Sequence, residues 1–456
     1  MPGGACEATW SDAEPSSDTR ERLWTCGCDR APRNPSDSLE SFLDAVHQDT
    51  GFSGAVVVSR WGEPISEGGW GMANREAGAD FTPDTPSDGA SLAKTFVAAG
   101  LWQLQAEGVL ELADLVQAYV PNYPHGGTRL SHLLEHSAGI SELDDASGLS
   151  NAEVVAAMGS EPAFTPGSRF SYCNECFDVL ALVAERVSGQ PWPLFLEERF
   201  FGPLGMDSAF VRPAFLQDWE GVRTKGYRVE DGEVVAHDVY DNEPFYGSSN
   251  AYLSARDLAA WGTAFVQTEV LPAAVLAQGE QKAEFASGGV SALNRLNWFQ
   301  VAPGRPAYFD GHLRGFHSVL YWDPSTGLVV AWVSNTLGAR PVEVQLTREL
   351  VRIAEGGEDL GLPRFSGTGL QAEVPPSAVE GAFFHPALGD VSVRWMDGTI
   401  GVSLNDGSER PGYPATGYYV PDLGVEIGFL DLRANRLSTL HWLTVFDSVA
   451  ATLHGG

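Results

Sequence analysis

Two pairs of strand-like segments, far apart in the chain, constrain the fold most. The first pair, residues 54–58 and the segment from Ile65 onward, flanks the turn Trp61-Gly62. The second pair, residues 317–322 and 328–334, flanks a turn-rich loop of hairpin length. Strands at both ends of a segment, with helical patterns between them, predict one antiparallel sheet covered by helices, an α+β fold.

Between the two strand pairs, apolar residues recur at the spacing of helices. From Ala93 to Leu104 they fall on positions that share one face, so a helix is expected to start at about Ser91 and to enter the core. Two further helices are expected over residues 174–187 and 254–265. These helices are the candidates for covering the predicted sheet.

The composition changes twice along the chain and predicts three parts. Residues 1–37 are rich in Ser, Asp, Pro and Gly without hydrophobic periodicity, which indicates a loose extension before an ordered part that begins near Leu39. The α+β domain is expected over residues 38–360. After Pro363, short β-type runs alternate with turn signals, which is typical of an all-β module, a small barrel or sandwich, over residues 364–456.

The charge of the chain argues against nucleic acid as a partner. The formal net charge of −32 repels polyanions, and no cluster of Lys and Arg interleaved with aromatic residues offers a phosphate-binding face. The first thirty residues contain no apolar h-region, and no run approaches the roughly 20 apolar residues that cross a bilayer. We therefore expect a cytoplasmic protein without a membrane segment, or an exported one if translation starts upstream.

Five cysteines in so long a chain do not form a disulfide framework. Cys26 and Cys28 form a C-x-C pair, and Cys173 and Cys176 form a C-x-x-C pair. Together they can ligate zinc, or the second pair can be redox-active. We expect neither, because the spacing matches no standard zinc module and the second pair lies inside another motif. No metal ion and no organic cofactor is expected.

One of only three lysines lies one helical turn after a serine. Lys94 and Ser91 are three residues apart, so both face the same side of the predicted helix. A partly desolvated lysine can take the proton of a serine hydroxyl, and a helix N-terminus favours the negative charge that then develops. The alternative interpretation is an N-cap serine followed by an exposed lysine, because so short a pattern occurs by chance.

Three further segments favour the first interpretation. Residues 164–174, FTPGSRFSYCN, resemble the P-G-x-x-F-x-Y-x-N element of class C β-lactamases and of related esterases and D-aminopeptidases. Residues 132–139, HLLEHSAG, and 201–206, FGPLGM, are similar to the H-L-L-x-H-x-S-G and P-L-G-M elements of the same proteins. The resemblance to this penicillin-recognising, serine β-lactamase-like superfamily covers roughly residues 40–350. It implies an antiparallel sheet with flanking helices and an all-helical subdomain.

The resemblance also implies roles for individual residues. Ser91 matches the acylated nucleophile, and Lys94 matches its activating partner. Tyr172 matches the tyrosine that relays a proton between nucleophile and leaving group, and Asn174 matches the asparagine whose amide bonds the lysine and the substrate. The other histidines, His136 among them, are expected to be structural.

The strand that lines the other wall of the cleft in these relatives, with a K-T-G or H-x-G sequence, is where this chain departs. The best match is the sequence FDGHLRGF, in which Phe309 occupies the basic position and Gly311 the glycine. In that register the backbone N–H of His312 forms an oxyanion hole with that of Ser91. The lost basic side chain puts activity on penicillins in doubt, and His312 or Arg314 compensates only if its side chain points into the cleft.

Two weaker similarities concern the surroundings of the cleft. Residues 247–254, GSSNAYLS, resemble a glycine-rich segment that borders the cleft in these relatives, so Ser249 and Asn250 are candidates for substrate contact. The C-terminal module resembles the lipocalin-like barrels appended to D-stereospecific aminopeptidases and to peptide cyclases of the penicillin-binding-protein type. In those relatives a barrel loop can restrict the substrate; here that role and a purely covering role stay open.

These motifs predict a serine hydrolase that acts through an acyl-Ser91 intermediate on small peptides, amides or esters. Three alternatives stay open: a β-lactamase, an acyl-transferring peptide cyclase, and a non-catalytic member that binds a peptide in the same cleft. The departure at Phe309 favours the last of these. A small molecule or short peptide is the expected partner, and the oligomeric state is not predicted.

Overall fold

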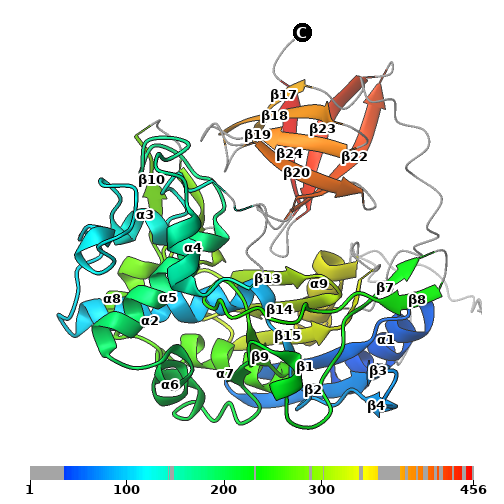
Figure 1. Cartoon of the computed structure of the whole chain (residues 1–456). Coiled ribbons are helices and arrows are strands. Elements are labelled where there is room, and N and C mark those ends of the chain that lie inside the picture. The colour runs from blue at the N-terminus through cyan, green and yellow to red at the C-terminus, as the bar shows by residue number, and fades with distance from the viewer. Residues whose placement is uncertain are drawn as a thin grey trace, which may run out of the picture. The chain divides into compact units, whose positions relative to one another are not determined.

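An eight-stranded antiparallel sheet forms the core of the α+β domain. The computed structural model describes residues 35–357, apart from gaps at 142, 144–147, 231–232, 287–289, 301 and 338–341, and eight strands of the C-terminal segment. The strand order in the sheet is β10-β11-β12-β13-β14-β15-β1-β2, and each neighbouring pair is antiparallel. Figure 1 labels β13, β14, β15, β1 and β2 of this sheet. The strands are β1 Gly54–Arg60, β2 Glu63–Trp70, β10 Lys282–Glu284, β11 Val290–Asn294, β12 Phe299–Gln300, β13 Ala307–Leu313, β14 Phe316–Trp322 and β15 Leu328–Ser334. The predicted sheet is confirmed, and β1 joins the two predicted strand pairs because it pairs with both β2 and β15.

Helices cover both faces of the sheet. Helix α7, Ala255–Val266, lies on one face, and helix α9, Val342–Ala354, lies on the other. Val329 of β15 faces α7, where a Cβ on Gly262 would lie 2.8 Å from Val329 Cγ1. Side chains alternate between the two faces of a strand, so Trp332, three positions after Val329, faces the other side of the sheet. There its Nε1 donates to Thr347 Oγ1 of α9 at 3.0 Å. Because both faces are covered, β14 and β15 are buried along their length, as their near-continuous apolar sequences predict.

The predicted helices form close to the expected residues. Helix α5 spans Asn174–Ser188. Helix α7 begins after Ser254, whose hydroxyl accepts the N–H of Asp257 while the Asp257 carboxylate accepts the N–H of Ser254. The helix expected from Ser91 starts as a short 3₁₀ turn, η1, Ala90–Leu92, and continues as α2, Ala93–Ala106. The other helices are α1 Pro35–Thr50, α3 Leu130–Leu134, α4 Asn151–Ala157, α6 Trp192–Leu196 and α8 Ala273–Gly279.

Helix α2 lies in the core and is held by aromatic contacts with α7. Phe96 stacks on Trp261 with ring centroids 4.3 Å apart, and Phe201 meets Phe96 edge-on at 5.5 Å. The indole of Trp261 also donates to Thr95 Oγ1 at 3.0 Å. These contacts fix the start of α2 in space, which matters because Ser91 directly precedes it.

The C-terminal segment forms a closed barrel (Figure 1). Its strands are β17 Gly381–His385, β18 Gly389–Met396, β19 Thr399–Ser403, β20 Glu409–Pro414, β21 Tyr418–Val420, β22 Val425–Arg433, β23 Arg436–Leu443 and β24 Ser448–Leu453. Each strand pairs antiparallel with the next, and β24 closes the barrel on β17. The all-β module predicted after Pro363 is therefore a barrel and not a sandwich.

Helix α1 shifts the predicted start of the ordered part. It begins at Pro35, ahead of Leu39 and inside the stretch that we assigned to a loose extension. Residues 1–34, with Cys26 and Cys28, lie outside the described residues. Within the part of the chain that the structure describes, no helix combines the length and the apolar character needed to cross a membrane.

Candidate active site

Ser91 follows a turn whose backbone is held by a buried carboxylate. Asp88 is buried, and its Oδ1 accepts the N–H of Ala90 at 2.8 Å. Ala90 adopts a left-handed conformation with φ 45°, which is unfavourable for a residue with a Cβ. Burial raises the pKa of Asp88 to about 6, while the bond from Ala90 and the charge of Arg212 oppose the rise. The turn leaves Ser91, within η1, partly exposed.

Lys94 contacts Ser91 as the spacing predicts. Its Nζ donates to Ser91 Oγ at 3.0 Å and to the backbone oxygen of Ser248 at 2.8 Å. The alternative interpretation of the motif is wrong, because Lys94 is 0% exposed and no side chain caps η1. A buried amine bonded to a hydroxyl is placed to take the proton of that hydroxyl.

Tyr172 lies beside Lys94 and is supported by a neutral histidine. Lys94 Nζ is 5.1 Å from the centroid of the Tyr172 ring, which stacks on the ring of His136 at 4.6 Å. His136 Nδ1 accepts the N–H of Cys173 at 3.0 Å, so the ring proton is on Nε2, which donates to Asn297 Oδ1 at 2.8 Å. Burial lowers the pKa of His136 to about 3, and the charge of Lys94 adds to this effect. His136 therefore stays neutral and packs against Tyr172.

The first turn of α5 differs from the prediction in two ways. Cys173 and Cys176, which we expected to be neither a metal site nor a redox pair, are joined by a disulfide. Cys173 Sγ also accepts the N–H of Cys176 and caps the helix. Asn174 is exposed at the first position of α5, and its side chain has no hydrogen-bond partner among the described residues. The expected amide contact to Lys94 is therefore not formed, and the carbonyl of Ser248 bonds the amine instead.

Gly311 lets β13 approach the turn that precedes Ser91. A Cβ on Gly311 would lie 2.4 Å from Gly89 O and 2.9 Å from Ser91 N, so a glycine is needed for this contact. Phe309 lies on the same face of β13 and is buried, with its ring centroid 5.7 Å from that of Phe299. The position that is basic in the relatives is filled here by a core side chain.

The His312 side chain points away from Ser91. In the pairing of β13 with β14, Gly311 is opposite Ser318, whose hydroxyl donates to Gly89 O at 2.6 Å. His312 is opposite His317, one position along, so both imidazoles lie on the other face of the sheet with their ring centroids 4.5 Å apart. The imidazole of His312 therefore does not replace the missing basic side chain.

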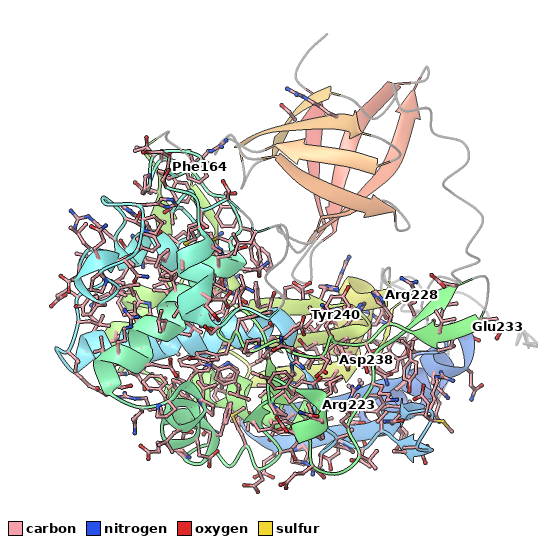
Figure 2. All side chains as sticks on the ribbon, viewed as in Figure 1. Phe164, Arg223, Arg228, Glu233, Asp238 and Tyr240 are labelled. Atoms are coloured by element: carbon pink, nitrogen blue, oxygen red, sulfur yellow. A yellow bond between two sulfur atoms is a disulfide. The ribbon has the colours of Figure 1, made fainter. Side chains whose placement is uncertain are left out.

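Arg314 is engaged in a charge network with Glu243 and Arg212. Its Nη2 lies 2.8 Å from Glu243 Oε1, and its guanidinium carbon is 3.6 Å from the ring centroid of Tyr240, an exposed residue labelled in Figure 2. Glu243 also holds Arg212 at 2.5 Å, and Arg212 Nε donates to Asn250 Oδ1 at 3.0 Å. Glu243 is thus shared by the guanidinium groups of Arg212 and Arg314, and the candidate Asn250 is buried as a structural partner of Arg212.

Two further residues complete the surroundings of Lys94: Ser248, from the glycine-rich segment 247–254, and Asp178, which no motif indicated. Ser248 accepts the bond from Lys94, and its N–H donates to Asp178 Oδ1 at 3.0 Å. Asp178 is 3% exposed on α5. The available signal was an aspartate inside the apolar run FDVLAL of a helix predicted to enter the core, because buried carboxylates need partners. The predicted candidate Ser249, next to Ser248, is half-buried.

Comparisons with known proteins show the family and the fold of this chain. The Beta-lactamase family model matches residues 39–355. The putative penicillin-binding protein PbpX of Bacillus subtilis (strain 168) is 27% identical over 292 residues, which cover 63% of this chain and 72% of that protein. A D-aminopeptidase of Brucella abortus (strain S19) is 30% identical over 189 residues, or 39% of this chain and 36% of that protein. The octameric penicillin-binding protein homologue from Pyrococcus abyssi has the same fold, with a TM-score of 0.61 over 91% of this chain and 99% of that chain at 18% identity. Since the family model matches well over half of its residues, this chain belongs to the Beta-lactamase family.

Proposed function

We propose that this protein is a serine hydrolase that acts through an acyl-Ser91 intermediate on small peptides, amides or esters. The observation that supports this most is the 3.0 Å contact between Lys94 Nζ and Ser91 Oγ at the start of a buried helix. The similarity to a D-aminopeptidase of Brucella abortus supports an amide as one class of substrate.

The proposed reaction begins when Lys94 takes the proton of Ser91. Ser91 Oγ forms a bond to the substrate carbonyl carbon, and the electron pair of the carbonyl moves to its oxygen. The N–H groups of Ser91 and His312 are the proposed donors to this oxyanion, since Gly311 brings β13 against the Ser91 amide. The carbonyl re-forms as the C–N or C–O bond to the leaving group breaks; Tyr172 gives its phenol proton to the leaving amine or alcohol and regains one from the Lys94 ammonium. Water then attacks the acyl carbon, the bond to Ser91 Oγ breaks, and a proton of that water returns to Ser91 Oγ as the acid is released.

The residues of β13 favour an uncharged peptide, amide or ester over a penicillin. Penicillins carry a carboxylate, and the position that is basic in the relatives holds Phe309, which is buried in the core. Arg314 is already paired with Glu243. A peptide amide with an N-terminal D-residue is the first substrate to test.

Covalent labelling tests the proposal. We expect a fluorophosphonate to add one probe to the wild-type chain, as measured by intact mass, and none to Ser91→Ala. Ser160→Ala, which changes an exposed serine outside the motifs, is the matched control and keeps the adduct. Wild-type protein that takes up no acylating probe and still binds a peptide would contradict the proposal and indicate a non-catalytic member.

Product analysis separates the related activities. Nitrocefin turnover faster than hydrolysis of esters and D-residue amides would indicate a β-lactamase. A cyclic product from a peptide with a free amine would indicate acyl transfer in place of hydrolysis.

A further inference from the structure

A buried aspartate on α5 is connected to Lys94 through the backbone of one residue. Ser248 donates its N–H to Asp178 Oδ1 at 3.0 Å and accepts the bond from Lys94 Nζ on its carbonyl oxygen at 2.8 Å. Both side chains are buried, with exposed fractions of 0% for Lys94 and 3% for Asp178. Between two buried groups of opposite charge, the electrostatic attraction is stronger than it is in water.

The position of Ser248 between the two side chains is fixed by the residue before it. Gly247 has φ 111°, which only glycine adopts readily. A Cβ on Gly247 would lie 2.5 Å from the carbonyl oxygen of Phe177 and 2.8 Å from Ala181 Cβ, so the segment lies directly on α5. Ser248 is therefore a rigid connection between α5 and the first turn of α2.

We infer that Asp178 is a positioning and electrostatic partner of Lys94: its carboxylate, held by the backbone of Ser248, stabilises the ammonium that forms when Lys94 takes the proton of Ser91. This inference rests on the proposed function. Asp178 contacts no reacting atom, because Ser248 separates it from Lys94. Its role is comparable to that of a buried carboxylate that stabilises the cation of a neighbouring general base.

The groups that act on Asp178 come from several elements. Burial raises the pKa of Asp178 to about 7; the bond from Ser248 and the charge of Lys94 oppose the rise, and Glu175, earlier on α5, adds to it. Tyr246, in the segment before Gly247, also interacts with the Asp178 charge. From α4, the neutral amide of Asn151 donates to the backbone oxygen of Asp178 at 2.7 Å. Lys94 is the cation among these neighbours.

Titration of the lysines tests the coupling without any need for turnover. Protein labelled with ¹³C at lysine Cε gives three lysine signals, because the chain contains only Lys94, Lys225 and Lys282. The variants Lys225→Arg and Lys282→Arg assign the Lys94 signal. In Asp178→Asn, which keeps an acceptor for the Ser248 N–H, we expect the titration midpoint of Lys94 to fall by about one pH unit or more. An unchanged midpoint in the folded variant would overturn the inference.

A matched control and a wild-type measurement keep the test decisive. Asp257→Asn removes a buried carboxylate that caps α7 and leaves the Lys94 midpoint unchanged. If Asp178→Asn does not fold, the wild-type Lys94 signal decides: ionisation of Asp178 adds a second inflection near pH 7, and a single-step curve contradicts the coupling.

The rate of Ser91 acylation adds a functional readout. In Asp178→Asn the acid limb of the pH profile for fluorophosphonate labelling moves to lower pH, because a less stable ammonium leaves more free amine at a given pH. If Asp178 only supports the structure, its substitution lowers the labelling rate at all pH values and leaves the midpoint of the acid limb unchanged. If wild-type Ser91 is not labelled, the proposed function fails while the titration still decides the Lys94–Asp178 coupling.

Discussion

The serine side and the strand side of the candidate active site differ in what they keep of the family pattern. The serine side, Ser91, Lys94 and Tyr172, brings its side chains together as the motif requires. The strand side, residues 309–312 of β13, keeps only its backbone arrangement: Gly311 still approaches the Ser91 amide, while Phe309 is part of the core. Activation of a hydroxyl and binding of an oxyanion need a base and backbone N–H groups, whereas binding of a charged substrate group needs a strand side chain. We infer that this chain keeps the first function and has lost the second.

Removal of the base has the largest expected effect. Lys94→Ala leaves the Ser91 hydroxyl without a proton acceptor, and we expect the second-order rate of fluorophosphonate labelling to fall by roughly 10³-fold to 10⁴-fold. Lys282→Ala is the matched control, because Lys282 is a second lysine outside the site, and burial lowers its pKa to about 8. A variant that lacks Lys94 and labels at the wild-type rate would show that another group activates Ser91.

Addition of a methyl group at Gly311 of β13 has the next largest expected effect on the acylation rate. In Gly311→Ala the new Cβ meets Gly89 O at 2.4 Å and Ser91 N at 2.9 Å, so the strand must move away from the turn. Loss of one oxyanion donor lowers the acylation rate by roughly 10²-fold or more. Gly127→Ala, where the new Cβ meets no atom within 4 Å, serves as the control and retains the rate. Equal rates for the two variants would contradict the role of β13.

Asp88, whose carboxylate bonds the turn before Ser91, affects the stability of the protein by an amount that depends on pH. Because the pKa of Asp88 is raised from 3.8 to about 6 in the folded protein, the native state binds more protons than the unfolded state between these values, and stability falls as the pH rises through this window. Asp88→Asn keeps an acceptor for Ala90 and removes this loss. We expect the variant to be more stable than the wild type by roughly 2 to 3 kcal/mol at pH 8, with the gain lost below about pH 4. Urea unfolding at both pH values measures this, and a gain that is independent of pH would refute it.

Phe309 is expected to affect stability and not chemistry. Phe309→Leu leaves a small gap against Phe299 and lowers the free energy of unfolding by about 1 kcal/mol, as measured in urea. The acylation rate stays within a few-fold of the wild type, because the Ser91 amide and the backbone of β13 are unchanged. A large loss of rate without a loss of stability would show that Phe309 contacts the reacting substrate.

Local patterns determined much of what could be predicted from the sequence. The three-residue spacing of Ser91 and Lys94 fixes their contact once a helix forms, and Ser254 marks the start of α7 by its own capping bond. The Lys94–Ser248–Asp178 connection joins three segments that only the folded chain brings together. No local pattern carries such a contact.

The orientation of the side chains on β13 also could not be predicted from the sequence. The sequence shows that His312 and Phe309 lie on opposite faces of a strand, but the face turned toward Ser91 depends on the pairing of Gly311 with Ser318. For Asn174 the motif predicted a contact with Lys94, and the capped first turn of α5 leaves that side chain exposed instead.

A structure of the protein after reaction with a slowly hydrolysed ester of a D-amino acid tests the proposed arrangement of Ser91 and β13 most directly. We predict an acyl group bonded to Ser91 Oγ, with its carbonyl oxygen within hydrogen-bond distance of the N–H groups of Ser91 and His312. An acyl group on another residue, or an acyl-Ser91 whose carbonyl oxygen is directed away from β13, would contradict this arrangement.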